Sequence, residues 1–254
     1  MEINLKGKLA VVTGGTGQLG RVICRTLADC GADVAIHYHQ NTGKARELVA
    51  ELKTKGVRAA AVQADVTDQA SIQAMRSQIL TQMGKAPEII VNNAVIQYKW
   101  VHVLDQSPAD YEGQFRSCVL HNVLMAQTFV PAMIEKKWGR VIAINTECAM
   151  QNFPNQSAYV SGKRGMDGVL RVLAKEIGSS QITVNQVAPG WMISENVPDD
   201  DSDGQRSYRA GVPLHRRGYD QDIANLVVFL ASDLAGFISG QYISVSGGNV
   251  MPAI

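Results

Sequence analysis

The sequence has little of what builds a disulfide framework or a zinc site. It contains only four cysteines in 254 residues, and no two of them form a C-x-x-C pair or a zinc knuckle. Small secreted scaffolds and zinc modules need paired or clustered cysteines. The sequence therefore predicts neither structural disulfides nor a bound metal.

The sequence also has little net charge. Lys and Arg total 24 against 23 Asp and Glu, which leaves a formal charge of +1 at pH 7. A nucleic-acid-binding protein normally has a basic excess or a basic face. We therefore expect no nucleic-acid partner.

Long apolar segments are missing as well. No uninterrupted apolar stretch approaches the ~18 residues that a membrane span requires. Glu2, Lys6 and Lys8 precede the first apolar run, and the amino terminus lacks the apolar region and cleavage site of a signal peptide. These absences predict a soluble, cytoplasmic protein with no membrane partner.

Short β-branched runs alternate with longer amphipathic segments along the whole chain. Gly, Asn or Asp stands at most junctions, and 23 glycines against eight prolines suit many tight turns. Helices are predicted between the strands, which we place at 8–13, 33–38, 58–63, 88–93, 140–145, 182–187 and 241–245. Repeated alternation of this kind indicates a parallel sheet with helices on both faces.

We therefore predict an α/β fold with a Rossmann-like, doubly wound parallel sheet of about seven strands. Short connections and the lack of any linker or repeat indicate a single domain over residues 1–254. The longest irregular stretch covers about 191–217. Loops of that length are usually functional or disordered, so this segment is a candidate substrate lid.

A glycine-rich turn follows the first predicted strand. Gly15-x-Gly17-x-x-Gly20 opens a helix, which is the context in which the backbone approaches a pyrophosphate at a helix N-terminus. The alternative is a tight structural turn between strand and helix. A P-loop is excluded because Arg21-Val22 stands where Lys-Ser or Lys-Thr is needed.

Tyr159 and Lys163 are four residues apart in a predicted helix, so they share one face. A tyrosine used as an acid or base near neutral pH needs its pKa moved from about 10 toward 7, roughly 4 kcal/mol of stabilisation of the phenolate. An adjacent ammonium can supply part of this stabilisation of the phenolate. The alternative is a surface tyrosine beside a solvated lysine.

Together these features resemble the short-chain dehydrogenase/reductase family, from about residue 5 to residue 249. Further segments match in order and spacing. They are Asp65-Val66 after the third strand, Asn92-Asn93-Ala94 at the end of the fourth, Val187-Ala188-Pro189-Gly190 followed by Ser194, and Gly240-Gln241 through Gly247-Gly248. Each segment alone is weak evidence for the family, but the whole set in this order and spacing is specific for it.

The resemblance implies an NAD(P)-dependent oxidoreductase that interconverts a carbonyl and a secondary alcohol on a small substrate. Tyr159, Lys163 and Thr146 are the implied catalytic residues, with Thr146 thirteen residues before the tyrosine. The implied cofactor-binding residues are Gly14, Thr16, Gly17, Gln18, Leu19, Gly20, Tyr38, His39, Asp65, Val66, Asn92, Ala94, Tyr159, Lys163, Pro189, Gly190, Met192 and Ser194.

The chain departs from the family pattern at four positions. Gln18 replaces the middle glycine of the usual turn, and Val95 replaces the last glycine of NNAG. Thr146 replaces the catalytic serine but keeps a hydroxyl donor. Cys118 stands where the family has a helix asparagine, which puts a water relay to Lys163 in doubt. These departures leave a second interpretation open: a catalytically impaired dinucleotide-binding protein that acts as a sensor or a partner subunit.

The second predicted strand ends without a carboxylate, which NAD-preferring relatives use for the ribose hydroxyls. We therefore expect NADP(H) rather than NAD(H). The carboxyl ends of the later strands should carry the substrate pocket. Its candidate residues are Tyr98, Trp100, Glu147, Gln151, Phe153 and Trp191, with Gln97 beside them. Family resemblance further implies a homotetramer or homodimer.

Overall fold

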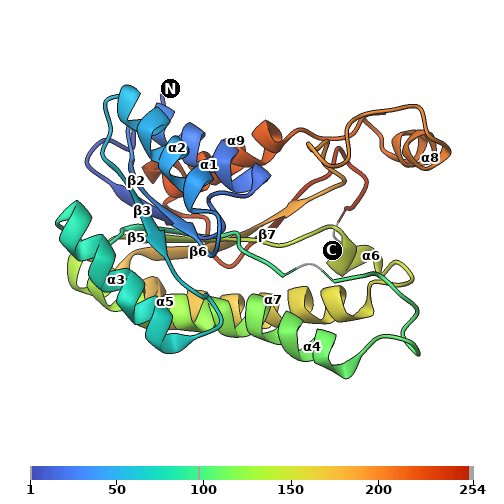
Figure 1. The fold of residues 1–254 in the computed structure, drawn as a ribbon, viewed down its shortest axis with the longest axis horizontal. Helices are drawn as coiled ribbons and strands as arrows, with labels where there is room; N and C mark the ends of the chain where they lie inside the picture. Colours follow the sequence, from blue (N-terminus) through green and yellow to red (C-terminus); the bar gives the residue numbers. More distant parts are fainter. Residues whose placement is uncertain (1, 97, 252–254) are drawn as a thin grey trace.

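The computed structural model describes residues 2–96 and 98–251 and has the predicted architecture (Figure 1). Seven parallel strands form one sheet in the order β3-β2-β1-β4-β5-β6-β7. Their bounds are β1 Leu9–Val12, β2 Asp33–Tyr38, β3 Ala59–Gln63, β4 Ile89–Asn92, β5 Gly139–Ile144, β6 Ile182–Pro189 and β7 Tyr242–Val245. The predicted doubly wound α/β fold is confirmed.

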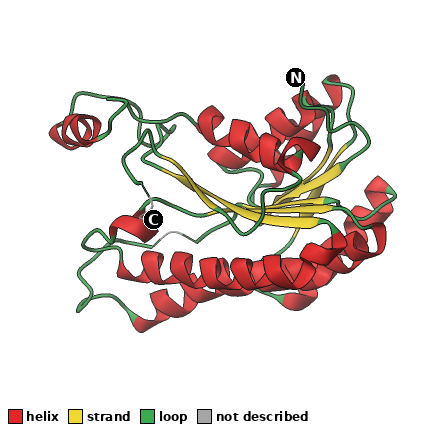
Figure 2. Ribbon diagram, turned by 180° about the vertical axis from the view of Figure 1, so that it is seen from behind, coloured by secondary structure: helices red, strands yellow, loops and turns green. Residues whose placement is uncertain are grey.

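Helices cover both faces of the sheet (Figures 1 and 2). One layer packs α1 Gln18–Asp29, α2 Thr42–Thr54 and α9 Asp220–Ala231; the other packs α3 Gln69–Met83, α5 His121–Lys136 and α7 Ser157–Ile177. Alternate residues of β1 serve different layers: Ala10 and Val12 join the first core, and Leu9 and Val11 the second. Burial on both faces explains why the strands are continuously apolar.

The predicted long helix before β5 consists of three parts. α4 Pro108–Gln114 passes into a π-helical turn, η1 Phe115–Leu120, and then into α5. The whole helix, 108–136, is long and apolar enough to pass a length-and-composition test for a membrane span, but 56% of its most apolar window is buried inside the domain. Packing against the sheet therefore accounts for its apolar residues.

The predicted lid segment is not wholly irregular. Residues Asp203–Gly211 form the helix α8, and the short helix α6 Cys148–Gln151 follows β5. Both views show α8 standing away from the body of the domain, at the end of the long connections that leave β6 and return to α9 (Figures 1 and 2). Because this helix has only nine residues, its amphipathic pattern is too short to distinguish it from the flanking loops in the sequence.

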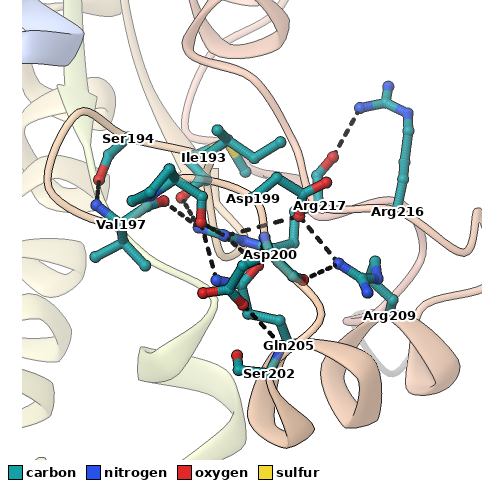
Figure 3. Close-up of polar contacts among 12 residues, drawn as sticks. Ile193, Ser194, Val197, Asp199, Asp200, Ser202, Gln205, Arg209, Arg216 and Arg217 are labelled. Carbon is teal, nitrogen blue, oxygen red and sulfur yellow. Dashed lines mark hydrogen bonds and ion pairs between the residues drawn. The ribbon is translucent and has the colours of Figure 1, made fainter.

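A buried arginine gives the lid segment its shape. Arg217 is 1% exposed, and its guanidinium lies 4.6 Å from the ring centroid of Trp191. It donates hydrogen bonds to the carbonyls of residues 192, 197 and 198 and to Gln205 Oε1 of α8, at 2.5–3.1 Å (Figure 3). Because these oxygens belong to residues 192–198 and to α8, one guanidinium holds both parts of the segment together.

A buried histidine ties the glycine-rich turn to the sheet. His37 of β2 is 2% exposed; its Nδ1 accepts from Gly14 N at 2.9 Å, and its Nε2 donates to the Ala64 carbonyl at 3.0 Å. The amide donor at Nδ1 requires the neutral ring with its proton on Nε2. Burial lowers the pKa of His37 to about 4.

This geometry predicts acid-sensitive stability. The unfolded chain binds a proton at His37 below about pH 6.5, whereas the folded chain does so only near pH 4. The contribution of His37 to stability is therefore complete above pH 6.5 and is lost as the pH falls toward 4, on the order of 3 kcal/mol in total. We expect denaturant unfolding of the His37→Asn variant to show a correspondingly weaker pH dependence over this interval. Parallel curves for variant and wild type would contradict the assignment.

Candidate functional site

A cavity of about 740 Å³ opens at the carboxyl ends of six strands. It lies where the strand order reverses, between β1 and β4, which is where open α/β sheets bind their ligands. The predicted site residues that line it are Gly14, Thr16, Gly17, Gln18, Leu19, Gly20, His39, Asp65, Val66, Ala94, Thr146, Tyr159, Lys163, Pro189 and Gly190. One cavity thus brings together the glycine turn and the three predicted catalytic residues.

Three glycines of the turn, at positions 14, 15 and 20, lie too close to neighbouring atoms to carry a side chain. A Cβ at Gly20 would lie 2.2 Å from the Gly14 carbonyl oxygen, and one at Gly15 would lie 2.8 Å from Ile36 Cγ2. Gly14 has a φ of +63° and lies against Asn93 and Ala94. The free amides at the N-terminus of α1, which begins after Gly17, face the cavity. Such a cradle fits the pyrophosphate of a dinucleotide.

The adenosine side of the cavity is polar. His39, Gln40 and Asn41 follow β2, while Ala64 through Thr67 follow β3. The carboxylate of Asp65 accepts from the amide and the hydroxyl of Thr67, at 2.8 and 2.7 Å. Partial burial raises the pKa of Asp65, but these hydrogen bonds outweigh it and the net shift is downward. Asp65 is therefore an ionised acceptor at neutral pH.

At the other end of the cavity, Thr146, Tyr159 and Lys163 converge. The Lys163 ammonium lies 5.9 Å from the ring centroid of Tyr159 and donates to the Ile144 carbonyl at 2.6 Å. Burial lowers the pKa of Lys163. Burial also raises the pKa of Tyr159, and the hydrogen bond with the Thr146 hydroxyl lowers it only in part, so the net shift is opposite to the downward shift expected from the sequence. The tyrosine is therefore a protonated hydroxyl at neutral pH, ready to donate.

Two residues that the sequence analysis missed hold this group in place. Asn145 donates to the Lys163 carbonyl at 3.1 Å and accepts from the Thr146 amide at 2.9 Å. The Tyr242 hydroxyl, from β7, donates to the Thr146 carbonyl. No sequence motif marks either residue, because both act through segments far apart in the chain.

Cys118 lies in the π-helical turn and does not line the cavity. Its thiol donates to Gln114 Oε1 at 3.4 Å, and its carbonyl accepts from Asn122 Nδ2 at 2.6 Å. Asn122 is 2% exposed and accepts from Asn92 Nδ2 at 2.7 Å. Asn122 is thus a buried connection between the helix and β4.

Four predicted cofactor-binding residues do not line the cavity. Asn92 bonds Asn122 behind it, and Tyr38 is half-buried at the end of β2. Met192 bridges to Gly218, and the Ser194 hydroxyl accepts from the Val197 amide at 2.9 Å. The last two belong to the segment shaped by Arg217, whose course the sequence did not predict.

The predicted substrate residues are dispersed. The ring of Trp100 lies 6.4 Å from that of Tyr159, beside the catalytic group. Phe153 lines a separate cavity of about 250 Å³. The hydroxyl of Tyr98 lies over Gly113 of α4, and the Gln151 amide oxygen is buried. Glu147 and Trp191 both meet Tyr208 of α8. Gln97 lies outside the described residues.

Side chains of the types that bind metals are spread out in the described part of the chain. Across residues 2–96 and 98–251, no three His, Cys, Asp or Glu side chains gather closely enough to hold an ion. His37 of β2 and His39 just after it both line the cavity, but both ring nitrogens of His37 are engaged in hydrogen bonds.

Comparison with known proteins agrees with this geometry. The family model described as enoyl-(acyl carrier protein) reductase matches residues 16–249. The 3-oxoacyl-[acyl-carrier-protein] reductase FabG of Staphylococcus aureus (strain Mu50) is 35% identical, covering 96% of this chain and 98% of that protein.

Solved structures are similar over the whole length. A blue fluorescent protein from a metagenomic library, in complex with NADPH, is 33% identical with a TM-score of 0.90, covering 98% of this chain and all (100%) of that one. A 7α-hydroxysteroid dehydrogenase in complex with NADH and 7-oxo glycochenodeoxycholic acid is 28% identical with a TM-score of 0.91, covering 99% and 97%. The chain belongs to the short-chain dehydrogenase/reductase family and is an NAD(P)-dependent oxidoreductase of that family.

Proposed function

We propose that this enzyme interconverts a carbonyl group and a secondary alcohol on a small substrate. The observation that carries the proposal is the convergence of Thr146, Tyr159 and Lys163 in the cavity that also contains the glycine turn. A proton donor and a nucleotide cradle in one cavity are what hydride transfer to a carbonyl requires. The alternative, an impaired nucleotide-binding protein, needs no such convergence.

The cofactor fits the residues that line the cavity. The amides after Gly17 would hold the pyrophosphate, Asp65 and Val66 would flank the adenine, and Lys163 would hold the nicotinamide ribose. When bound, the nicotinamide supplies the hydride acceptor or donor. The protein contributes orientation, exclusion of water and control of one proton.

The proton is controlled at the Tyr159 hydroxyl. Its raised pKa keeps the proton in place until a carbonyl oxygen gains negative charge next to it. The Thr146 hydroxyl, beside Tyr159, would donate a second hydrogen bond to the same oxygen. The Lys163 ammonium then stabilises the phenolate that is left, because an opposite charge in a buried site favours the ionised form. In alcohol oxidation the proton would move in the opposite direction, from the alcohol hydroxyl to the ionised Tyr159.

Replacing Tyr159 with Phe tests this assignment. We expect turnover to fall by about 10²–10⁴-fold, the usual contribution of a general acid, while the dissociation constant of the cofactor changes less than about threefold. Turnover is measured by nicotinamide absorbance on a panel of 3-oxoacyl thioesters, steroid ketones and polyols. Thr146→Ser, which keeps the hydroxyl, is the matched variant and should stay active. Wild-type turnover in the Phe variant would contradict the mechanism, and tight cofactor binding without turnover on the whole panel would favour the impaired protein.

NADP(H) is the cofactor that we propose. His39, Gln40 and Asn41 line the adenosine side where β2 ends, and none of them carries a negative charge at neutral pH. Asn41 also caps α2 by accepting from Lys44 N at 3.1 Å, so a helix N-terminus lies beside the place for a 2′-phosphate. A helix N-terminus favours an anion by roughly 0.3–1 kcal/mol at an exposed site.

This proposal predicts a lower dissociation constant for NADPH than for NADH. Titration by fluorescence or calorimetry should show the preference in the wild type and its loss or reversal in His39→Asp, because the new carboxylate repels the phosphate. Thr54→Asp adds the same charge at the far end of α2 and should leave the ratio unchanged. Tighter binding of NADH by the wild type would overturn the assignment.

We further propose that the chain forms a homodimer or homotetramer through α5 and α7. Between these helices lies an apolar groove of about 600 Å³, and Val172 and Ile134 at its edge are 55% and 42% exposed. Exposed apolar area of this kind on two adjacent helices suits a second copy of the same face.

Val172→Glu should therefore reduce the molar mass measured by light scattering to that of a monomer. Lys175→Glu, which adds the same group to an exposed position of α7 outside the groove, is the control. A wild type that is monomeric at micromolar concentration would contradict the proposal. The cytoplasmic location, and the lack of nucleic-acid and membrane partners, stay predictions from the sequence.

A further inference from the structure

A buried carboxylate lies immediately after the catalytic hydroxyl. Glu147 follows Thr146 at the start of α6 and is only 3% exposed. Both of its oxygens are engaged: Oε1 accepts from the Tyr208 hydroxyl at 2.9 Å, and Oε2 accepts from Asn249 Nδ2 at 2.9 Å. A buried charge is costly unless it is hydrogen-bonded in this way. The two donors come from α8 and from the chain beyond β7.

Tyr208 carries the contact into the lid segment. Its hydroxyl also accepts from the Trp191 amide at 2.7 Å, and its ring meets the Trp191 ring edge-on with centroids 5.2 Å apart. Gly190 makes this approach possible, because a Cβ there would lie 2.8 Å from the Tyr208 hydroxyl and 3.0 Å from Ser246 Cα. The start of the lid segment at Trp191, the lid helix at Tyr208 and the segment after β7 at Asn249 are therefore all connected to the carboxylate of Glu147.

The same carboxylate is linked to the catalytic cavity through the backbone. The Glu147 amide donates to the Pro189 carbonyl at 2.9 Å, and Pro189, Gly190 and Thr146 all line the cavity. This backbone bond fixes the position of Glu147 beside the cavity, while the carboxylate itself is bonded to Tyr208 and Asn249, so a change of the side chain loosens the lid and leaves the cavity wall in place. Arg217, by contrast, shapes the lid segment internally and bonds none of these cavity residues.

We propose that Glu147 is a positioning residue that fixes the lid helix α8 and the carboxyl-terminal tail against the catalytic loop, so that the substrate is enclosed beside Thr146 and Tyr159. The inference rests on the proposed function, because it assigns the lid to the same reaction site. Glu147 acts through Tyr208 and Asn249 rather than by touching the reacting atoms.

The chemistry of the contact makes it sensitive to protonation. An ionised carboxylate only accepts hydrogen bonds, and both partners donate to it. Burial raises the pKa of Glu147, while the hydrogen bonds from Asn249, Tyr208 and the Trp191 amide lower it; the net shift is upward. The other titratable groups facing this contact are Cys148 beside Glu147 and Arg217 over Trp191, next to Tyr208. A proton added at low pH would leave one donor without an acceptor and release the lid.

Hydrogen exchange and steady-state kinetics on the full-length enzyme test the proposal. Glu147→Gln keeps one acceptor oxygen where the carboxylate has two, so the hydrogen bonds from Tyr208 and Asn249 cannot both be kept as they are, and exchange across 203–211 should be at least tenfold faster than in the wild type. KM for the substrate should rise at least tenfold with kcat changed less than about threefold, while the cofactor dissociation constant stays the same. Tyr208→Phe should reproduce both effects, and the double variant should add little to either single one.

The control is Asp201→Asn, which removes an exposed acid whose ion pair with Arg209 of α8 contributes little to stability and which does not contact Glu147. It should leave exchange and KM unchanged. The pH profile supplies a further readout: the acid limb of kcat/KM in the wild type should be absent in Glu147→Gln. Unchanged exchange in Glu147→Gln, or equal effects in Asp201→Asn, would overturn the positioning role. Because exchange needs no turnover, it tests the lid contact even if the proposed reaction fails on every substrate.

Discussion

The site depends on one close approach between backbone segments. The start of α1 lies so near the end of β1 that any side chain at Gly20 would collide with the Gly14 carbonyl. This contact fixes the N-terminus of α1 under the cavity and points its free amides at the place for the pyrophosphate. His37 fastens the opposite side of the turn by accepting from the Gly14 amide. The other walls of the cavity come from residues at the ends of β2, β3, β4, β5 and β6, arranged around this turn.

Burial at the catalytic end acts against charge on both partners of the Tyr159–Lys163 pair. It raises the pKa of the phenol and lowers that of the ammonium. Burial therefore disfavours the ionised form of each group. A hydroxyl that keeps its proton until a neighbouring oxygen becomes negative is what the proposed carbonyl chemistry would need. The surrounding contacts from Asn145 and Tyr242 hold the geometry that this chemistry needs.

Much of the fold and part of the site could be predicted from the sequence because they rest on local pattern. Apolar runs gave the strands, and the order of short motifs gave the glycine turn, Thr146, Tyr159 and Lys163. The path of 191–217 could not be predicted, since it depends on Arg217 bonding carbonyls about twenty residues earlier in the chain. The pairing of Glu147 with Tyr208 and Asn249 joins residues 61 and 102 positions apart, and no local pattern reports such contacts.

The substitution at Cys118 changes less than its position suggests. Its side chain bonds Gln114 and does not line the cavity, while its carbonyl is occupied by the Asn122 amide. Asn122 in turn binds Asn92 at the end of β4, so the polar connection between helix and sheet is kept by a different residue. Thr146 likewise keeps the hydroxyl that the reaction needs. Of the four departures from the family pattern, Cys118 lies behind the cavity, whereas Gln18, Val95 and Thr146 line it. The cavity therefore keeps the remaining glycines of the turn, a hydroxyl at position 146, Tyr159 and Lys163, which are the groups that the proposed function needs.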